Sequence, residues 1–336
     1  MMKFIHTADL HLKRIFKNIN IDKNLRREDQ WKCLEKIIEA SNEVDFLMIS
    51  GDLYEREYFT LSDTHRLLEA FKNTKARIII ALGNHDHYKE DSVFKNIKLP
   101  ENVFVFPPYK KYFQFDEFNL RIYGFSWEKD LYKDYDLNFD LDKNYNNILV
   151  MHGTVDGLDD YLPINIEKIR DFDYVALGHI HKFMKINEKI FYPGSPEGLS
   201  FKETGPRYYI YGNLKDKTLT TKQVKCQIKK LENYKVDISE KNINEILEEL
   251  SGLNKDTIYR LELLGKNSEK DFYIKTIKSR FDFEIIDKTE KYYEIDKLIE
   301  ENKNTYIENV FKDLKNSQSP YKDKALDLAV KLLLGD

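Results

Sequence analysis

Histidine, aspartate and asparagine recur in short segments that each follow an apolar, strand-like run. The sequence holds eight histidines, and most of them lie in these segments. The segments are Asp9-Leu10-His11, Gly51-Asp52, Gly83-Asn84-His85-Asp86, Met151-His152-Gly153 and Gly178-His179-Ile180-His181. Because open α/β sheets build their sites beyond the carboxyl ends of strands, we expect these side chains to meet at one rim.

Carboxylate, imidazole and amide groups together suit a pair of divalent cations. Two cations ~3.5–4 Å apart can clamp the attacking and leaving oxygens of a phosphoryl displacement, and a shared carboxylate can hold that spacing. Imidazole favours Mn, Fe and Zn, whereas Mg and Ca prefer oxygen ligands, so we expect a transition-metal site. His179 and His181 are two residues apart, and on an extended chain both would point to the same side.

Two sheets are predicted to position these segments. The first hundred residues alternate apolar runs with helical patterns, and Thr60 and Asp63 have the spacing of a capping box. The expected strands there are 3–7, 45–50 and 77–82, and one expected helix is 26–42. Further strands are expected at 103–106, 120–125, 147–151, 174–177, 189–192, 207–211 and 218–228, with a short helix near 166–170. We interpret these later strands as a second sheet packed on the first. The fold class is then α/β, a two-sheet β-sandwich flanked by helices.

The last third of the chain differs in composition, because lysine and glutamate dominate after about residue 231. Strands at 235–238, 257–264 and 281–287, with helices at 243–250 and 270–280, indicate a small α/β cap. A helical pattern follows over 295–336, broken at Ser319-Pro320. We therefore predict three segments, 1–231, 232–290 and 291–336. In the last, Leu326, Ala329, Val330 and Leu333 form an apolar stripe that either packs on its own chain or docks a partner.

Composition excludes several classes of protein. With 41% hydrophobic and 13% aromatic residues the chain is too apolar to be disordered. A net charge of −4 argues against a globally basic nucleic-acid binder but leaves room for a local basic patch. Two cysteines are too few for a disulfide scaffold. No apolar run approaches the ~18 residues that span a bilayer. Asp9 lies where a signal peptide would have an uninterrupted apolar stretch. We therefore expect a cytoplasmic protein without membrane contact.

The ordered set D-x-H, G-D, G-N-H-D, H-G and G-H-x-H resembles the signature of calcineurin-like metallophosphoesterases. More narrowly, the chain is similar to SbcD-type DNA-repair exonucleases over about residues 3–231. That closer resemblance depends on four stretches. They are HTADLHL at 6–12, GDLYER at 51–56, GHIHK at 178–182 and YPGSPEGLSF at 192–201, the last followed by Glu203-Thr204-Gly205.

The resemblance implies a role for each motif residue. One cation would take Asp9, His11 and His181, the other would take Asn84, His152 and His179, and Asp52 would bridge them. His85 would act on the leaving oxygen as acid or electrostatic stabiliser, and Asp86 could accept its other N–H. The nucleophile would be a metal-activated water, with Mn²⁺ as the working metal. Glu55 stands where archaeal and eukaryotic members carry a catalytic histidine, which is closer to the bacterial pattern.

The resemblance also implies a substrate and partners. It predicts a DNA exonuclease or endonuclease in DNA repair that is a homodimer and works with an SbcC-like SMC-type ATPase. Lys13, Arg14 and Lys17 could contact the DNA backbone, or could simply be solvated loop residues. One alternative is a phosphodiesterase or phosphatase acting on a small nucleotide-like substrate. The other is a non-catalytic subunit that binds DNA ends, against which the complete set of ligands argues.

Overall fold

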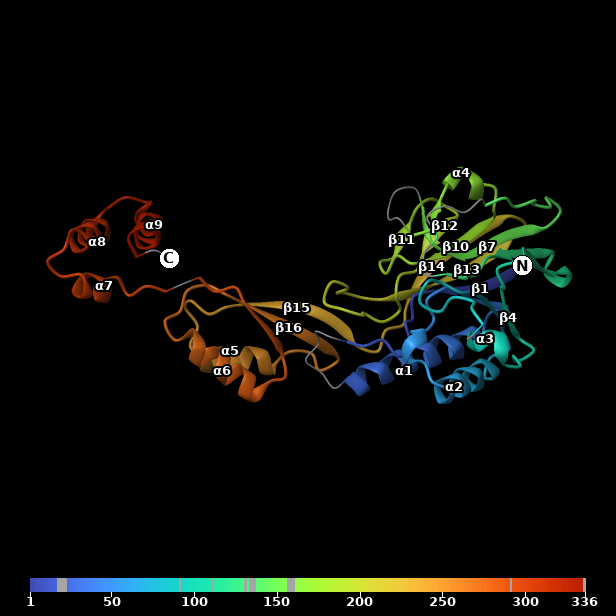
Figure 1. The fold of residues 1–336 in the computed structure, drawn as a ribbon, viewed down its shortest axis with the longest axis horizontal. Coiled ribbons are helices and arrows are strands. Elements are labelled where there is room, and N and C mark those ends of the chain that lie inside the picture. Colours follow the sequence, from blue (N-terminus) through green and yellow to red (C-terminus); the bar gives the residue numbers. More distant parts are fainter. Residues whose placement is uncertain are drawn as a thin grey trace. The chain divides into compact units, whose positions relative to one another are not determined.

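The computed structural model describes residues 1–16, 23–90, 92–109, 111–129, 132, 137–155, 161–290 and 292–334. These residues form two compact units (Figure 1). The first comprises Met1–Asn233 and Asn254–Arg260, and the second comprises Tyr234–Leu253 and Leu261–Asp336. The three-segment division expected from composition stays a prediction.

The first sheet of unit 1 has the strand order β14-β13-β1-β2-β3-β4. Its strands are β1 (Met2–Thr7), β2 (Phe46–Ser50), β3 (Arg77–Ala81), β4 (Val103–Val105), β13 (Tyr208–Lys215) and β14 (Thr218–Lys225). The strands β1 to β4 are parallel, and β13 pairs antiparallel with β1. In β2, Leu47 and Ile49 face one apolar cluster and Phe46 and Met48 face another. Both faces are buried, which explains the uninterrupted apolar runs.

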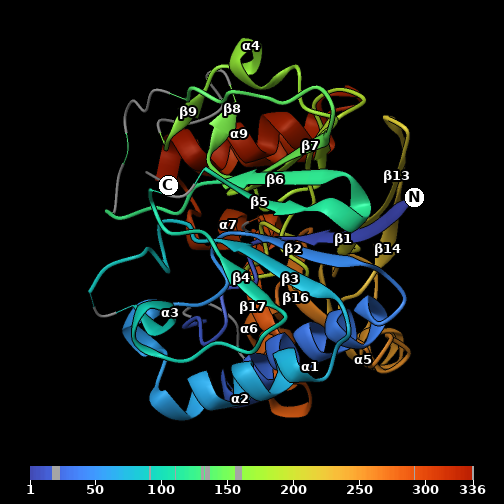
Figure 2. The same cartoon turned by 90° about the vertical axis from the view of Figure 1, so that its right-hand side faces the viewer.

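The second sheet has the order β11-β12-β10-β7-β6-β5. Its strands are β5 (Tyr112–Phe115), β6 (Leu120–Gly124), β7 (Asn146–His152), β10 (Tyr174–Gly178), β11 (Met184–Lys185) and β12 (Ile190–Tyr192). The short strands β8 (Thr154–Val155) and β9 (Pro163–Ile164) pair separately. The two large sheets lie face to face in Figure 2, and apolar residues of both form one cluster between them.

The two-sheet α/β fold expected from the sequence is confirmed, but its assignment of strands to sheets was wrong in part. The expected strands 103–106, 207–211 and 218–228 lie in the first sheet as β4, β13 and β14, not in the second. The hydrogen-bonding edges of β1 and β3 remain open until β13 and β4 pair with them. An apolar pattern shows that a strand is buried, but it does not specify its partner.

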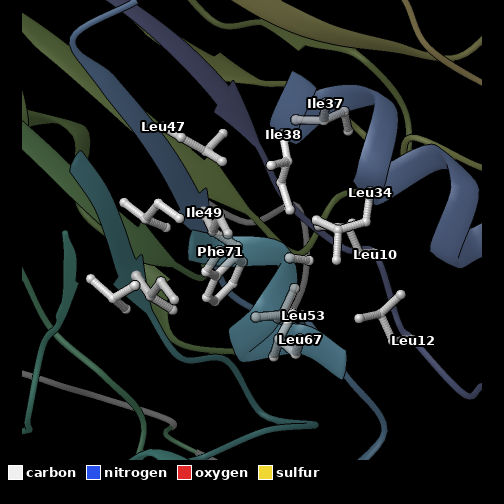
Figure 3. Close-up of a cluster of buried hydrophobic side chains, with 14 of the residues drawn as sticks. Leu10, Leu12, Leu34, Ile37, Ile38, Leu47, Ile49, Leu53, Leu67 and Phe71 are labelled. Atoms are coloured by element: carbon white, nitrogen blue, oxygen red, sulfur yellow. The ribbon is translucent and has the colours of Figure 1, made fainter. Parts of the chain in front are cut away.

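Helices cover the outer face of the first sheet. They are α1 (Lys23–Ser41), α2 (Leu61–Lys72) and the short α3 (Val93–Asn96). Leu34, Ile37 and Ile38 of α1 and Leu67 of α2 share one apolar cluster with Ile49 of β2 (Figure 3). The predicted capping box is present at the start of α2, where Thr60 and Asp63 each accept from the backbone N–H of the other. Short helices η1 (Arg56–Tyr58), η2 (Asp116–Phe118) and α4 (Ile166–Ile169) lie in connections.

A three-stranded sheet has its first two strands running from unit 1 into unit 2, and unit 2 also contains two groups of helices. The sheet has the order β15-β16-β17, with strands β15 (Lys230–Asp237), β16 (Thr257–Leu264) and β17 (Glu284–Asp287). The helices α5 (Ile243–Ser251) and α6 (Lys270–Arg280) share an apolar cluster with it. The β-α-β-α-β order agrees with the predicted small α/β cap. No helix within the described ranges is both long and apolar enough to cross a bilayer.

The last three helices pack on one another. They are α7 (Ile295–Glu301), α8 (Tyr306–Asn316) and α9 (Lys322–Leu334). The stripe of α9 lies in their common cluster around Phe311, and its Leu326, Ala329 and Val330 are buried there. Of the two alternatives left open by the sequence, packing on its own chain is therefore the observed one. The use of this stripe as a docking face was wrong, because α7 and α8 already cover it.

Phe311 is the fully buried centre of this three-helix cluster, so its removal should loosen α9. We expect Phe311→Ala to cost about 3–5 kcal/mol of the cluster's stability, the usual range for a buried Phe. Hydrogen exchange of the α9 amides measures this locally, and Tyr306→Ala on the exposed face of α8 is the control. Unchanged protection of α9 in Phe311→Ala would contradict the packing.

Candidate metal centre

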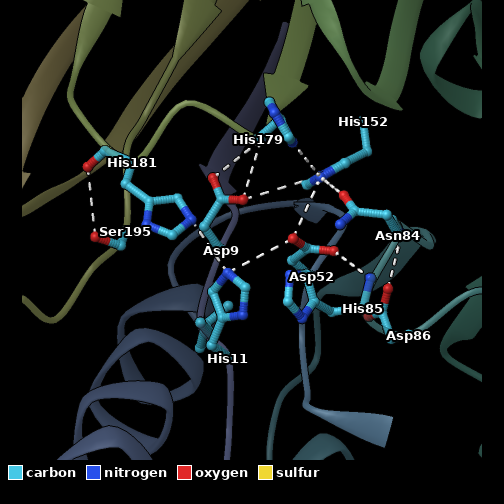
Figure 4. A network of polar contacts seen from close by, with 12 residues as sticks. Asp9, His11, Asp52, Asn84, His85, Asp86, His152, His179, His181 and Ser195 are labelled. Carbon is cyan, nitrogen blue, oxygen red and sulfur yellow. Dashed lines mark hydrogen bonds and ion pairs between the residues drawn. The ribbon is translucent and has the colours of Figure 1, made fainter. Parts of the chain in front are cut away.

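The five polar segments converge at one rim of the sandwich (Figure 4). Asp9 and His11 follow β1, Asp52 follows β2, and the segment 83–86 follows β3, all in the first sheet. His152 ends β7, and 179–181 follow β10 in the second sheet. The hydroxyl of Ser50 donates to the carbonyl of Ala176 at 3.0 Å and joins the two sheets beside this rim. The expected meeting of these segments is observed.

Unusual backbone conformations turn the side chains inward. Asp9, His11, Asp52 and His179 have φ of 53°, 45°, 50° and 103°. Such positive values are uncommon outside glycine and cluster at functional sites. The value at His179 also corrects an expectation, since 179–181 is not extended chain. His179 turns toward His152, with 3.3 Å between its Nδ1 and Nε2 of His152, whereas His181 turns toward His11.

Two glycines leave the room that the centre needs. A Cβ on Gly83 would stand 2.3 Å from Oδ1 of Asp52. A Cβ on Gly178 would stand 1.8 Å from the carbonyl oxygen of Ser50, closer than any contact between unbonded heavy atoms. Glycine is therefore required at 83 by the approach of the neighbouring Asp52 and at 178 by the approach of the two sheets.

The polar atoms lie close enough to share cations. Three groups have ligand atoms within 4.8 Å of one another: Asp9 with His11 and His181, His11 with Asp52 and His85, and Asp9 with Asp52 and His152. Oδ2 of Asp52 lies 3.5 Å from Nε2 of His11 and 3.3 Å from Nε2 of His152. Asp52 thus stands between the two halves. Oδ1 of Asn84 is 3.1 Å from Nε2 of His152 and adds an amide oxygen to the second half.

The hydrogen bonds of three imidazoles show that the site fits cations. Nδ1 of His11 pairs with Glu55 at 2.9 Å, Nδ1 of His181 with Glu203 at 3.0 Å, and Nδ1 of His152 with the carbonyl of Ser50 at 3.0 Å. Each partner accepts, so Nδ1 carries the proton and Nε2 presents a lone pair. Nε2 of His11 and of His181 then face each other at 3.1 Å. Facing lone pairs repel, and a shared cation removes that repulsion.

The charges of the site favour a cation in the same place. Burial disfavours a charged His152, but the carboxylates of Asp52 and Asp9 raise its pKa to about 9. Burial also opposes the charge of Asp52, yet His152 and His11 hold its pKa well below the usual value. Carboxylates that attract a proton to the Nε2 position of His152 attract a divalent cation there even more strongly.

Glu55 orients His85, a role that was expected for Asp86. Its Oε2 lies 2.8 Å from Nδ1 of His85 while its Oε1 binds His11. Burial opposes the charge of Glu55, but these two histidines lower its pKa to about 2. The expectation that Asp86 accepts from His85 was wrong. Asp86 accepts the backbone N–H groups of Leu53 and Gly83, both at 2.7 Å, because its carboxylate turns inward to hold the loop.

Glu203 was missed as a part of the site, although its segment was noted for its resemblance. Besides His181 it accepts from the hydroxyl of Ser195 at 2.8 Å and from the backbone N–H of Leu199 at 3.1 Å. Burial opposes its charge, but the hydrogen bond from His181 lowers its pKa to about 2. The only sequence signal was Glu203 itself, an acidic residue close after a turn-rich stretch.

Glu203→Gln should weaken metal binding through His181. An amide oxygen can replace only one of the two carboxylate oxygens, so either His181 or the 195–199 loop loses its partner. We expect metal affinity to fall about 10- to 100-fold, the usual effect of losing such a partner. Calorimetric titration with Mn²⁺ measures this affinity. The control is Glu188→Gln, because Glu188 is an exposed glutamate that forms an ion pair with Lys185. Equal affinity in wild type and Glu203→Gln would contradict the assignment.

Two cavities adjoin the rim. The first, of about 580 Å³, is lined by His85 and Glu55 of the site together with Arg14, Phe201 and Arg260. The second, of about 650 Å³, is lined by His179 and His181 together with Lys182 and Arg207. Lys202 lines both cavities.

Of the basic residues that follow the first motif, the structure places Arg14 beside the centre. Arg14 borders the first cavity, with its Nη1 3.6 Å from Oε1 of Glu55. Lys13 instead pairs with Asp63 of α2 at 3.2 Å. Lys17 lies outside the described residues.

Comparison with known proteins identifies the family to which the chain belongs. The crystal structure of TT1561 of Thermus thermophilus aligns with a TM-score of 0.41 and 11% identity over 66% of this chain and 98% of TT1561. An uncharacterized metallophosphoesterase of Bacillus subtilis, YhaO, is 27% identical over 290 residues, which cover 79% of this chain and 69% of YhaO. The profile of the calcineurin-like phosphoesterases matches residues 2–183, more than half of the chain. This match spans all five segments that build the rim, and the chain belongs to the calcineurin-like phosphoesterase family.

Proposed function

We propose that the protein is a phosphodiesterase that cleaves DNA in DNA repair with two divalent cations, for which Mn²⁺ is the proposed metal. The family makes it a metal-dependent phosphoester hydrolase. The observation that carries the proposal further is the rim itself, where Asp52 stands between two groups of lone-pair donors. We assign Asp9, His11 and His181 to one cation, Asn84, His152 and His179 to the other, and Asp52 to both.

The residues around the cations have separate tasks. Two bound cations supply a nucleophile from water and neutralise the charge that develops on the phosphate. His85 lies next to them, because its backbone N–H donates to Oδ1 of Asp52 at 3.0 Å. With Nδ1 held by Glu55, its ring presents Nε2 as the remaining polar atom, and 38% of the side chain is exposed to an arriving substrate. We assign His85 to protonate the leaving oxygen.

The two cavities favour a diester over a monoester. A phosphate held at the rim has one cavity on the side of His85 and another on the side of His179 and His181. Each cavity has a volume in the range that holds a small ligand. A phosphodiester with a substituent on both sides would use both cavities, whereas a phosphate monoester would use one. The basic residues that line these cavities would contact neighbouring phosphates; they are Arg14, Lys182, Lys202 and Arg207.

A turnover assay tests the proposal. Purified protein with Mn²⁺ should release nucleotides or fragments from linear DNA and should also hydrolyse bis(p-nitrophenyl) phosphate, and chelation should stop both reactions. Hydrolysis of the small diester without any cleavage of DNA would favour the small-nucleotide alternative. Binding of DNA without hydrolysis of either substrate would favour the non-catalytic alternative.

The proposal includes partners. As the resemblance implies, we propose a homodimer that works with an SbcC-like SMC-type ATPase. Contact with that ATPase cannot use the buried stripe of α9, but Leu328 and Leu332 of the same helix are exposed. Co-purification with the ATPase after Leu328→Glu together with Leu332→Glu tests whether these residues take part.

A further inference from the structure

A stacked pair of side chains faces the first cavity. The guanidinium carbon of Arg260 lies 4.4 Å from the centroid of the Phe201 ring. Phe201 itself is buried in a cluster with Phe16, Leu199 and Leu231, and Ile258 packs against the same cluster. The backbone of Arg260 lies in β16 and its guanidinium rests on the Phe201 ring. The side chain is partly exposed and lines the cavity.

This pair has the form of a stacking platform for a nucleobase. An arginine plane that rests on an aromatic ring offers its other face to a flat, π-rich partner, and bases stack on guanidinium planes as they do on aromatic rings. Phe16 and Leu199 extend the apolar lining beside it. Arg14 and Lys202, which line the same cavity, supply positive charge for a phosphate.

The cavity also adjoins one particular group of the proposed reaction. His85 and Glu55 line it, so it lies on the side of the group that we assign to the leaving oxygen. Its volume of about 580 Å³ falls within the range for a bound small ligand. We propose that this cavity binds the leaving nucleoside of the substrate, with its base stacked on the guanidinium of Arg260, which itself rests on the ring of Phe201. The inference rests on the proposed function and assigns a base-binding role to residues outside the metal centre.

Dinucleotides that lack one base test this directly. The substrates are thymidylyl-thymidine and its two abasic forms, one without the 5′ base and one without the 3′ base, each assayed with Mn²⁺. The product that carries no phosphate identifies the leaving nucleoside. For the wild type, removal of the leaving-side base should lower kcat/KM roughly 5- to 150-fold, the equivalent of one base–aromatic stack. Removal of the other base should have a smaller effect.

Two substitutions separate stacking from charge. Arg260→Ala should remove the preference for the leaving-side base, and Arg260→Lys should remove it equally, because lysine keeps the charge but has no planar face. Arg170→Ala is the matched control, because Arg170 is an exposed arginine directly after α4 that lines neither cavity. Thermal unfolding of each variant establishes that it is folded.

The outcomes are distinguishable. A base preference that persists in Arg260→Lys would show that only charge matters and would overturn the stacking role. A wild type that cleaves all three dinucleotides equally well would overturn the base subsite while leaving the proposed function intact. A wild type that hydrolyses bis(p-nitrophenyl) phosphate but neither dinucleotides nor linear DNA would overturn the proposed function, and the inference with it.

Discussion

Asp52→Asn should abolish turnover while leaving the fold in place. Oδ2 of Asp52 lies within reach of Nε2 of both His11 and His152, and asparagine has the shape of aspartate but lacks its charge. Bound cations contribute several kcal/mol to such a reaction, so we expect kcat to fall by ~10³-fold or more. Metal content measured by plasma emission should fall below two ions per chain.

Asp173→Asn is the matched control for this variant. Asp173 is also a buried aspartate, but it accepts from the backbone N–H of Asn147 at the opposite end of β10 from the rim. Its loss should lower stability and leave metal content unchanged. An Asp52→Asn protein with two ions and full activity would rule out the bridging role.

His85→Ala should separate chemistry from metal binding. We place His85 on the leaving oxygen and not among the metal ligands, so this variant should keep both cations. Its kcat should fall by ~10²- to 10⁴-fold, the range for loss of a general acid. Turnover of bis(p-nitrophenyl) phosphate and metal content, measured on the same sample, test the expected loss of kcat and the expected retention of both cations.

The control for His85→Ala is His65→Ala, because His65 is an exposed histidine of α2. It should change neither property. A large loss of metal from His85→Ala would show that His85 is a ligand, the alternative role that its place in a group with His11 and Asp52 allows.

The sequence was sufficient for the elements that carry the rim. The apolar runs of β1, β2 and β3 end close to the predicted residues, so the polar segments after them could be expected at one edge of a sheet. The short strand β5 was not recognised, since its residues 112–115 have only one buried member. The sequence could not predict that β13 belongs to the first sheet, because β13 pairs with β1, which lies about two hundred residues earlier in the chain.

The residues that orient the histidines could not be predicted for a similar reason. Glu203 reaches His181 across 22 residues, and Glu55 reaches His85 across 30. Neither pair has a regular spacing on a helix or strand. Asp86 lies next to His85 in sequence, but the inward turn of its side chain depends on the packing of two loops.

Anomalous diffraction from crystals of the protein loaded with Mn²⁺ would show directly whether Asp52 holds two cations. We expect two anomalous peaks ~3.5–4 Å apart, both within ligand distance of the carboxylate of Asp52. One peak should be bound by Asp9, His11 and His181, and the other by Asn84, His152 and His179. A single peak would contradict the dinuclear centre, and two peaks of which only one contacts Asp52 would contradict its bridging role.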